Sequence, residues 1–378
     1  MSVSHWQETS GGQSSITHEV VVVGAGLIGS YIASLLVESG KDVAIVEKQY
    51  PASGASGRNA GMVLLGLRDS YNEAIENLGH KSALEIWRMT DTNVRRMREL
   101  SKKHQVQYEE IGTYYFGGTP ESDADLKQSV TLLERDGFQT LFYERDPLDR
   151  GFGAASYQPD DFATHPAELT QSIADTSGAS LYTNDELFAI ENQGIGLKVR
   201  TRCHVIYCEK VILALNGYAG LVDPFFLPYV SPARGQILLT EPAPRFLDVM
   251  CMNYRQTYYR QLPDGRFLVG GGRWQHVEQE HTWADEVTDN VQQYISSFIQ
   301  RYYPEAADVG ISRQWAGIHG MTRDGLPILG KLPHNPSVYF CVGFTGHGNS
   351  MGLVAGERAV DMMINDTRPG ILGIERLE

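Results

Sequence analysis

The chain has 378 residues, of which 42% are hydrophobic and 21% charged, a balance typical of folded globular proteins with room for two domains. Its formal net charge of −14, without any run of basic residues, argues against a nucleic-acid-binding protein. No stretch has the roughly 18 consecutive apolar residues of a membrane span, and the polar N-terminus does not have the pattern of a secretory signal. We therefore expect a cytoplasmic protein.

The N-terminal residues 1–16 are rich in Ser, Gly and Gln, which predicts a flexible or loosely docked arm. The four cysteines lack the paired spacing of a metal site, so we expect no metal, and we expect Cys203 and Cys208 to be buried free thiols. This pattern fits a reducing compartment.

Residues 20–47 have the order of a dinucleotide-binding βαβ unit. Four valines lead into a Gly-Ala-Gly-Leu-Ile-Gly turn over residues 24–29, followed by an apolar helix and a second apolar run that ends at Glu47. Gly24 allows the tight turn, Gly26 lets a pyrophosphate approach the backbone, and Gly29 lets helix and strand pack closely. Glu47 is placed to accept a hydrogen bond from an unphosphorylated ribose, which leaves NAD or FAD as the ligand.

The middle of the chain alternates between helical and strand-like patterns. Helical spacing covers about 71–105 with a break near Gly79, then 121–135 and 168–176, whereas 108–116 and 205–215 are strand-like. From 232 to 272 the pattern is β-rich, with strands predicted at 236–240, 257–261 and 267–270 and a hairpin turn at 263–265. An amphipathic helix follows and is expected to stop at Pro304.

The last segment repeats the order of the first: a strand at 338–342, a Gly-rich turn at 343–348 and a helix from about Met351. We therefore predict an α/β fold in which N- and C-terminal pieces build one Rossmann-type FAD-binding domain, interrupted by a mixed-sheet α+β substrate domain. The predicted boundaries are 17–90, 150–225 and 320–378 for the first domain, and 91–149 and 226–319 for the second.

Two further glycine clusters favour FAD over NAD. The segment 54–61 has small residues around Arg58, whose guanidinium offers fixed donors to a ring or a pyrophosphate. The segment 346–351 opens a helix whose N-terminal N–H groups can stabilise negative charge on a reduced flavin ring. A second helix terminus aimed at a ring has no role in a simple NAD site.

Together with 314–317 and 322–330, these segments resemble the FAD-dependent D-amino-acid oxidase superfamily, in the branch of glycine oxidase, sarcosine oxidase and the γ-glutamylputrescine oxidoreductases. The resemblance implies that the carbon beside an amine gives a hydride to flavin N5 and that an imine is formed. The residues expected to contact FAD are Gly24, Gly26, Leu27, Ile28, Gly29, Glu47, Lys48, Ser56, Gly57, Arg58, Asn59, Ala60, Gly61, Met62, Leu187, Ala214, Asn216, Gly217, Gly317, Gly346, His347, Gly348, Asn349, Ser350 and Met351.

The substrate side departs from these relatives. Where amino-acid oxidases often carry a carboxylate-binding Arg, this chain has His319, so Arg260 or Arg273 is the candidate replacement. We name His319, Arg273 and Tyr259 as candidate catalytic residues, and we expect Tyr259 rather than its neighbour Tyr258 to face the pocket.

Three further expectations concern aromatic, acidic and redox features. Trp274 and Trp315 are expected in the core, and the acidic run 278–289 as a solvated loop that could otherwise attract a polyamine. The cysteine that attaches FAD in sarcosine-oxidase-type relatives is absent near Gly317, so we expect non-covalent FAD. Because no lysine lies between Lys210 and Lys331 to assist oxygen, the acceptor is left open between dioxygen, assisted by a cationic His319 or His347, and a quinone or protein carrier.

The predicted function is FAD-dependent oxidation of a small-molecule amine or an N-substituted amino acid. One alternative is C–O oxidation of a 2-hydroxy acid or a polyol phosphate, for which His319 is a possible base. A second is a flavoprotein subunit of a larger complex, and the last is an NAD-only dehydrogenase. The sequence leaves the oligomeric state open.

Overall fold

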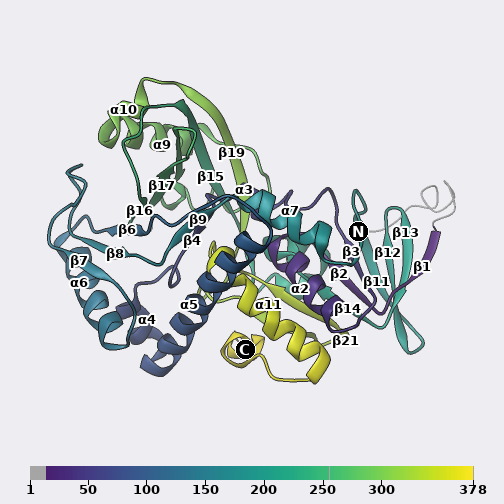
Figure 1. Ribbon diagram of the computed structural model, residues 1–378. Helices are drawn as coiled ribbons and strands as arrows, with labels where there is room; N and C mark the ends of the chain where they lie inside the picture. The colour runs from purple at the N-terminus through teal and green to yellow at the C-terminus, as the bar shows by residue number, and fades with distance from the viewer. Residues whose placement is uncertain (1–13, 255, 378) are drawn as a thin grey trace.

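A computed structural model describes residues 14–254 and 256–377, and two large sheets dominate it (Figure 1). Five strands of the first sheet are parallel, and only β20 runs antiparallel to its neighbour β21. In spatial order this sheet contains β10 (Ser180–Tyr182), β3 (Val43–Val46), β2 (Val20–Val23), β14 (Lys210–Leu213), β21 (Asn335–Val342) and β20 (Ile328–Leu332).

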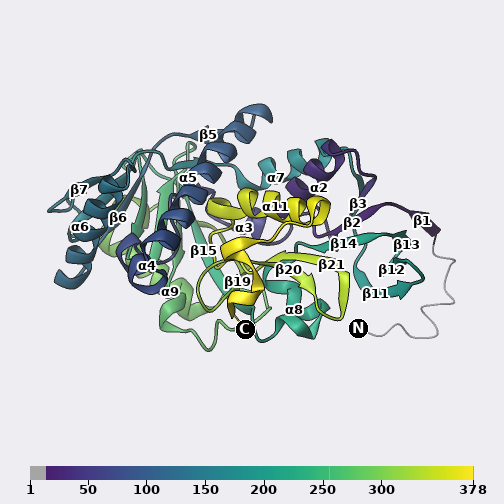
Figure 2. The same cartoon turned by 90° about the horizontal axis from the view of Figure 1, so that it is seen from below.

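The parallel strands are short and apolar because both faces of the sheet are covered. Every residue of β2 and β3 is buried. One face packs on α2 (Leu27–Glu38), α5 (His80–Lys103) and α11 (Gly348–Asn365), and α11 lies beside both other helices (Figure 2). The pairing of β14 with both β2 and β21 confirms that the two ends of the chain share one sheet.

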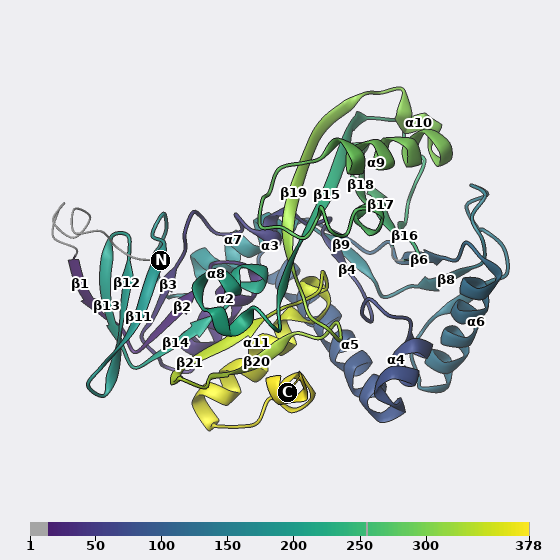
Figure 3. The ribbon, with the colours of Figure 1, turned by 180° about the vertical axis from the view of Figure 1, so that it is seen from behind.

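The second sheet has eight strands and is mixed. Its strands β16 and β6 pair in parallel, and all its other neighbouring strands pair antiparallel. Its long strands β15 and β19 run from the parallel sheet toward α9 (Asp289–Tyr302) and α10 (Pro304–Ala307) (Figure 3). In spatial order it contains β19 (Ile311–Met321), β15 (Ser231–Pro242), β18 (Arg266–Gly271), β17 (Thr257–Gln261), β16 (Met250–Asn253), β6 (Thr113–Phe116), β8 (Ala155–Gln158) and β7 (Leu141–Tyr143).

Most predicted helices are present, with small shifts at their ends. The apolar face of α9 packs on the eight-stranded sheet, and α9 ends before Pro304, as predicted. The glycine at 79 separates two helices, also as predicted. The remaining helices are α3 (Ala55–Arg58), α4 (Tyr71–Leu78), α6 (Pro120–Arg135), α7 (Pro166–Thr176), α8 (Ala219–Val222) and α10 (Pro304–Ala307), with 3₁₀ turns at Asn216–Tyr218, Pro224–Phe226, Arg273–Gln275, Gly370–Leu372 and Ile374–Leu377.

The structure corrects two of the predicted strands and contains two further small sheets. The run 108–116 is not one strand, because Gly112, with a φ of +61°, turns the chain between β5 and β6. The run 205–215 also divides, so that β13 and β14 belong to different sheets. The small sheets contain β1 (Ser14–Thr17), β13 (His204–Cys208), β12 (Gly196–Thr201) and β11 (Leu187–Gln193) in one, and β4 (Met62–Val63), β9 (Phe162–Thr164) and β5 (Tyr108–Glu109) in the other.

The predicted N-terminal arm is wrong for its last residues, because β1 pairs in parallel with β13; residues 1–13 of the arm lie outside the described residues. Cys203 is exposed rather than buried, whereas Cys208 is buried as expected.

The proposed domain boundaries stay a prediction, although β8, which falls within 150–225, pairs in the eight-stranded sheet. No helix in the described residues combines the length and apolar character needed to cross a membrane.

The glycine at 29 is required by close packing between α2 and the turn that precedes it. A Cβ at this position would collide with the carbonyl oxygen of Gly24 and lie 3.2 Å from the Cβ of Ala214. We expect Gly29→Ala to lower the free energy of unfolding by about 1–3 kcal/mol, as overpacking does elsewhere, in urea denaturation. Gly118→Ala is the control, since its Cβ meets nothing within 4 Å. Equal stability of the two variants contradicts this packing argument.

Candidate active site

The turn after β2 brings the N-terminus of α2 against α3. Gly24 has a φ of +104°, which L side chains rarely adopt. The N–H of Leu27 donates to Ser56 Oγ at 2.9 Å, and a Cβ at Gly26 would lie 2.9 Å from the same oxygen. The first N–H groups of α2 therefore face a narrow space walled by small residues, which suits a pyrophosphate.

The carboxylate of Glu47 points back at this turn. Its Oε2 accepts from the N–H of Ala25 at 2.8 Å, and its Oε1 accepts from the N–H of Gln49 at 2.9 Å. Glu47 therefore lies beside the glycine turn, and its role as the ribose ligand stays a prediction. The neighbouring Lys48 instead pairs with Glu186 at 3.0 Å.

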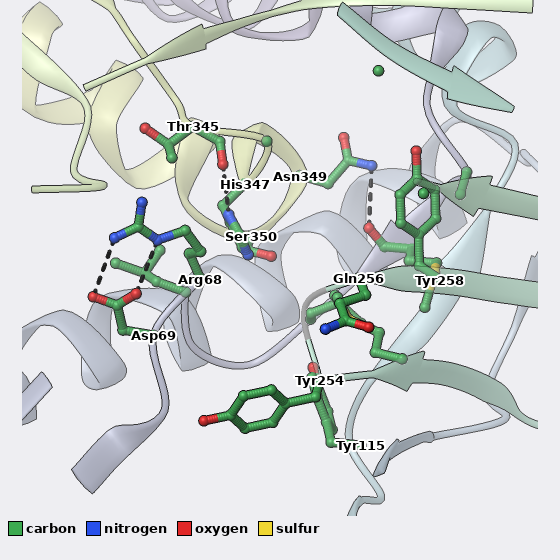
Figure 4. Close-up of a pocket in the computed structure, with 18 of the residues that line it drawn as sticks. Arg68, Asp69, Tyr115, Tyr254, Gln256, Tyr258, Thr345, His347, Asn349 and Ser350 are labelled. Carbon is green, nitrogen blue, oxygen red and sulfur yellow. Dashed lines mark hydrogen bonds and ion pairs between the residues drawn. The ribbon is translucent and has the colours of Figure 1, made fainter. Parts of the chain in front are cut away.

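The second glycine cluster joins the two ends of the chain. Arg58 Nε donates to the carbonyl of Ser53, and Arg58 Nη1 donates to that of Ala316 and pairs with Asp285. Asn349 Nδ2 on α11 donates to Asn59 Oδ1 at 3.1 Å (Figure 4). The cluster at 54–61 and the start of α11 are thus in direct contact.

Helix α11 begins at Gly348, three residues earlier than predicted, and its first turn opens on the same space. The residues before it are held by positive φ angles at Thr345 and Gly346, and His347 Nδ1 lies 3.0 Å from the carbonyl oxygen of Thr345 (Figure 4). The buried amide of Asn93 on α5 fixes this terminus, because its Nδ2 donates to the carbonyl of Asn349. Sequence reasoning missed Asn93, since nothing distinguishes it within its helix.

A cavity of about 330 Å³ lies against the eight-stranded sheet, and residues of α3 to α6 and of the turn before α11 line its other sides. Aromatic side chains line much of it, among them Trp87, Tyr115, Phe116, Tyr254 and Tyr258 (Figure 4). Nine of the residues predicted to contact FAD line it: Arg58, Asn59, Ala60, Met62, Gly317, Gly346, His347, Asn349 and Ser350.

The other predicted FAD residues lie outside this cavity lining. Those of the first turn, Gly24 to Gly29, and Ser56 form the narrow space described above. Ala214, Asn216 and Gly217 follow β14; a Cβ at Gly24 would meet the Ala214 carbonyl, and Asn216 Oδ1 accepts from the N–H of Phe344. Three more positions are Gly57, Gly61 and Gly348, where a Cβ would meet Ala52, Thr164 and Phe344 respectively. Leu187 and Met351 are buried in apolar clusters.

His319 lines the cavity from β19. Its ring lies over Gly235 of the paired strand β15, where any Cβ would collide with His319 Nε2. Burial, followed by the positive charge of Arg273 and the neighbouring His347, lowers the pKa of His319 to about 4. The imidazole is therefore uncharged at neutral pH, and the prediction of His319 as a cation that assists oxygen is wrong.

The prediction that Tyr259 faces the pocket is also wrong. Tyr259 is fully buried in the core beneath α9, where its hydroxyl donates to Asn253 Oδ1. Alternation along β17 turns Tyr258 toward the cavity instead, over Gly270, whose missing side chain leaves room for the ring (Figure 4). Burial raises the pKa of Tyr258 to about 12, so its hydroxyl stays protonated.

Of the two candidate arginines, only Arg273 reaches the cavity. Arg260 is buried and donates to the carbonyl of Ala60. Its positive charge is balanced by Glu109, with which it pairs at 3.0 Å. Arg273 makes no ion pair with any described residue, and burial lowers its pKa. The negative charge of Glu280 opposes this effect without forming an ion pair, so the Arg273 guanidinium keeps donors for an anionic group in the cavity.

The segment between β18 and α9 covers one side of the cavity. Trp274 lines the cavity and is 47% exposed, so its predicted core role is wrong, whereas Trp315 is partly buried and donates to the carbonyl of Arg58. The acidic run 278–289 is not uniformly solvated, because Glu280 is completely buried and pairs with Arg234 at 2.7 Å. Trp283 Nε1 donates to the carbonyl of Gly217, which ties this segment to the parallel sheet.

Glycine-lined helix termini at the carboxyl edge of a parallel sheet, beside an aromatic cavity, define a dinucleotide-dependent oxidoreductase. The residues fit FAD, because the α2 turn, Glu47 and the start of α11 would be placed to hold its phosphates, ribose and ring; these contacts stay a prediction. No described cysteine lines the cavity, and no group of described residues could hold a metal ion. Non-covalent binding of FAD stays a prediction.

Comparison with known proteins gives the family. Residues 19–362 match the DAO family of FAD-dependent oxidoreductases; the chain belongs to this family and its cofactor is FAD. It is 28% identical over 364 residues to the probable oxidoreductase OrdL of Rhizobium meliloti (92% of this chain, 83% of that one). It is 26% identical over 376 residues to the γ-glutamylputrescine oxidoreductase of Escherichia coli (93% and 85%). The crystal structure of L-proline dehydrogenase from P. horikoshii has the same fold, with a TM-score of 0.79 at 22% identity (93% and 95%).

We expect Glu47→Gln to weaken FAD binding by about 10- to 100-fold, because a charged acceptor becomes a neutral one. Titration of the apoprotein with FAD, followed by quenching of flavin fluorescence, measures this affinity. Glu38→Gln, at the exposed end of α2, is the control with the same charge change. Unchanged affinity in Glu47→Gln contradicts the ribose assignment.

The depressed pKa of His319 predicts a specific response to Arg273. In the unfolded chain, His319 binds a proton at a higher pH than it does in the folded protein. The free energy of unfolding therefore falls as the pH is lowered from about 6.5 toward 4. Removing the nearby cation in Arg273→Met should raise the pKa of His319, whereas Arg68→Met should leave it unchanged. A histidine-labelled NMR titration, with His319→Asn to identify the signal, measures both. An equal effect of the two variants contradicts the arrangement.

Proposed function

We propose that this protein oxidises the C–N bond of an amine or an N-substituted amino acid to an imine. The observation that carries the proposal is Arg273, which makes no ion pair with a described residue, beside the uncharged His319, in a cavity that the start of α11 also lines. The names of the similar γ-glutamylputrescine oxidoreductase and L-proline dehydrogenase, which act on nitrogen compounds, support the same class of substrate.

The chemistry requires positioning rather than strong acid–base catalysis. When bound, FAD supplies the acceptor for the hydride that leaves the carbon next to the nitrogen. Arg273 binds a carboxylate beside that carbon, and the uncharged imidazole of His319 can accept a hydrogen bond from the amine. The aromatic walls exclude water, which strengthens both interactions.

Oxidation of a 2-hydroxy acid is the second candidate, because Arg273 could also bind its carboxylate. That reaction favours a base whose pKa lies near the working pH, and His319, with a pKa of about 4, is a weak base there. We therefore rank C–N oxidation first. Dioxygen and a quinone or protein carrier both remain possible electron acceptors, and the cytoplasmic location remains a prediction.

Anaerobic stopped-flow spectroscopy of the FAD-loaded protein tests the proposal. We expect N-methyl amino acids to bleach the flavin and 2-hydroxy acids to leave it oxidised. In Arg273→Met the apparent Kd for an N-methyl amino acid should rise about 10- to 100-fold, because a charged hydrogen bond is lost, while the Kd of the corresponding amine without a carboxylate should not change. Bleaching by hydroxy acids alone contradicts C–N oxidation.

A further inference from the structure

The end of the cavity between α4 and α6 contains a second charged group that the proposed chemistry does not use. Asp125 on α6 lines this end. Its Oδ1 accepts from Ser70 Oγ at 3.1 Å and from Asn72 Nδ2 at 3.2 Å. These two contacts, both with the start of α4, hold the carboxylate in a fixed orientation.

The other carboxylate oxygen has no donor. Asp125 Oδ2 is buried and makes no hydrogen bond within the described part of the chain. A buried acceptor without a partner is destabilising, and the cost is greater for a charged one. An oxygen of this kind, on a side chain that lines a cavity, is suited to a donor supplied by a ligand.

The neighbouring charges do not account for Asp125. Arg68 at the same cavity pairs with Asp69 at 2.9 Å (Figure 4), and Arg58 pairs with Asp285. Among the described residues that line the cavity, Arg273 and Asp125 are the charged groups for which no ion pair is formed. The cavity therefore offers one cation on the His319 side and one anion between α4 and α6.

The surroundings of Asp125 also favour a cation. Burial and then the negative charge of Asp125 raise the pKa of Tyr254, which lines the cavity with its ring (Figure 4). The charge of Asp125 thus reaches Tyr254, and an aromatic ring in the same cavity also attracts an ammonium group.

We propose that Asp125 binds a second, protonated amino group of the substrate, remote from the nitrogen whose C–N bond is oxidised. This inference rests on the proposed function and narrows its substrate to a diamino compound with a carboxylate: Arg273 binds the carboxylate, and Asp125 Oδ2 accepts from the distal ammonium. It explains why Oδ2 lacks a donor among the described residues.

The first test measures binding without turnover. Perturbation of the absorbance of bound FAD, under anaerobic conditions, gives the Kd of 1,4-diaminobutane and of butylamine. We expect the diamine to bind about 10- to 100-fold more tightly, as a charged hydrogen bond provides. Equal affinity of the two compounds overturns the proposal, whether or not either compound reduces the flavin.

The second test uses variants. Asp125→Asn keeps an oxygen for Ser70 and Asn72 but replaces Oδ2 by a donor, so the preference for the diamine should disappear while butylamine binds as before. Glu121→Gln, an exposed carboxylate on α6, is the matched control and should keep the preference. If Asp125→Asn weakens both compounds equally, Asp125 has only a structural role.

Turnover separates this inference from the function on which it rests. In the wild type, the apparent Kd obtained from the rates of flavin reduction should be about 10- to 100-fold lower for ornithine than for norvaline. Both enantiomers of each compound are measured. Reduction by both with equal Kd contradicts the Asp125 site and leaves C–N oxidation standing. Failure of every amine and amino acid to reduce the flavin contradicts C–N oxidation, while the diamine preference still decides the role of Asp125.

Discussion

The parallel pairing of β2, β14 and β21 is the constraint on which the site depends. The carboxyl ends of parallel strands lie at one edge of a sheet, so the turns after β2 and β21 open on the same side although more than 300 residues separate them. The helices that follow, α2 and α11, then have their N-termini at the same edge of the sheet. The contact between Asn59 and Asn349 closes this arrangement between the two glycine clusters.

The eight-stranded sheet adds the substrate side of the cavity. Its long strands β15 and β19 carry His319 to the glycine clusters, and the absence of a side chain at Gly235 leaves space for the imidazole. The segment after β18 places Arg273 next to this ring. An uncharged histidine, an arginine without an ion pair to a described residue, and aromatic walls are therefore neighbours in one cavity.

Local patterns predicted the elements that depend on local physics. The glycine turn at 24–29, the acid at 47 and the amphipathic face of α9 each follow from spacing or backbone freedom, and the structure contains all three. Alternation along β17 showed only that Tyr258 and Tyr259 face opposite ways. It could not decide which face is inward, because both sides of that strand are covered by protein.

The sequence by itself determined the dinucleotide fold, the cofactor class and the family, because glycine positions and strand–helix order are encoded within short segments. Only the tertiary structure decided which charges remain uncompensated. Arg260 and Arg273 are equivalent as sequence, but Glu109 pairs with one of them and no described residue pairs with the other. Likewise Asp125 lines the cavity only because α6 packs beside α4. Charge compensation depends on neighbours that are distant in the chain, and packing alone brings them together.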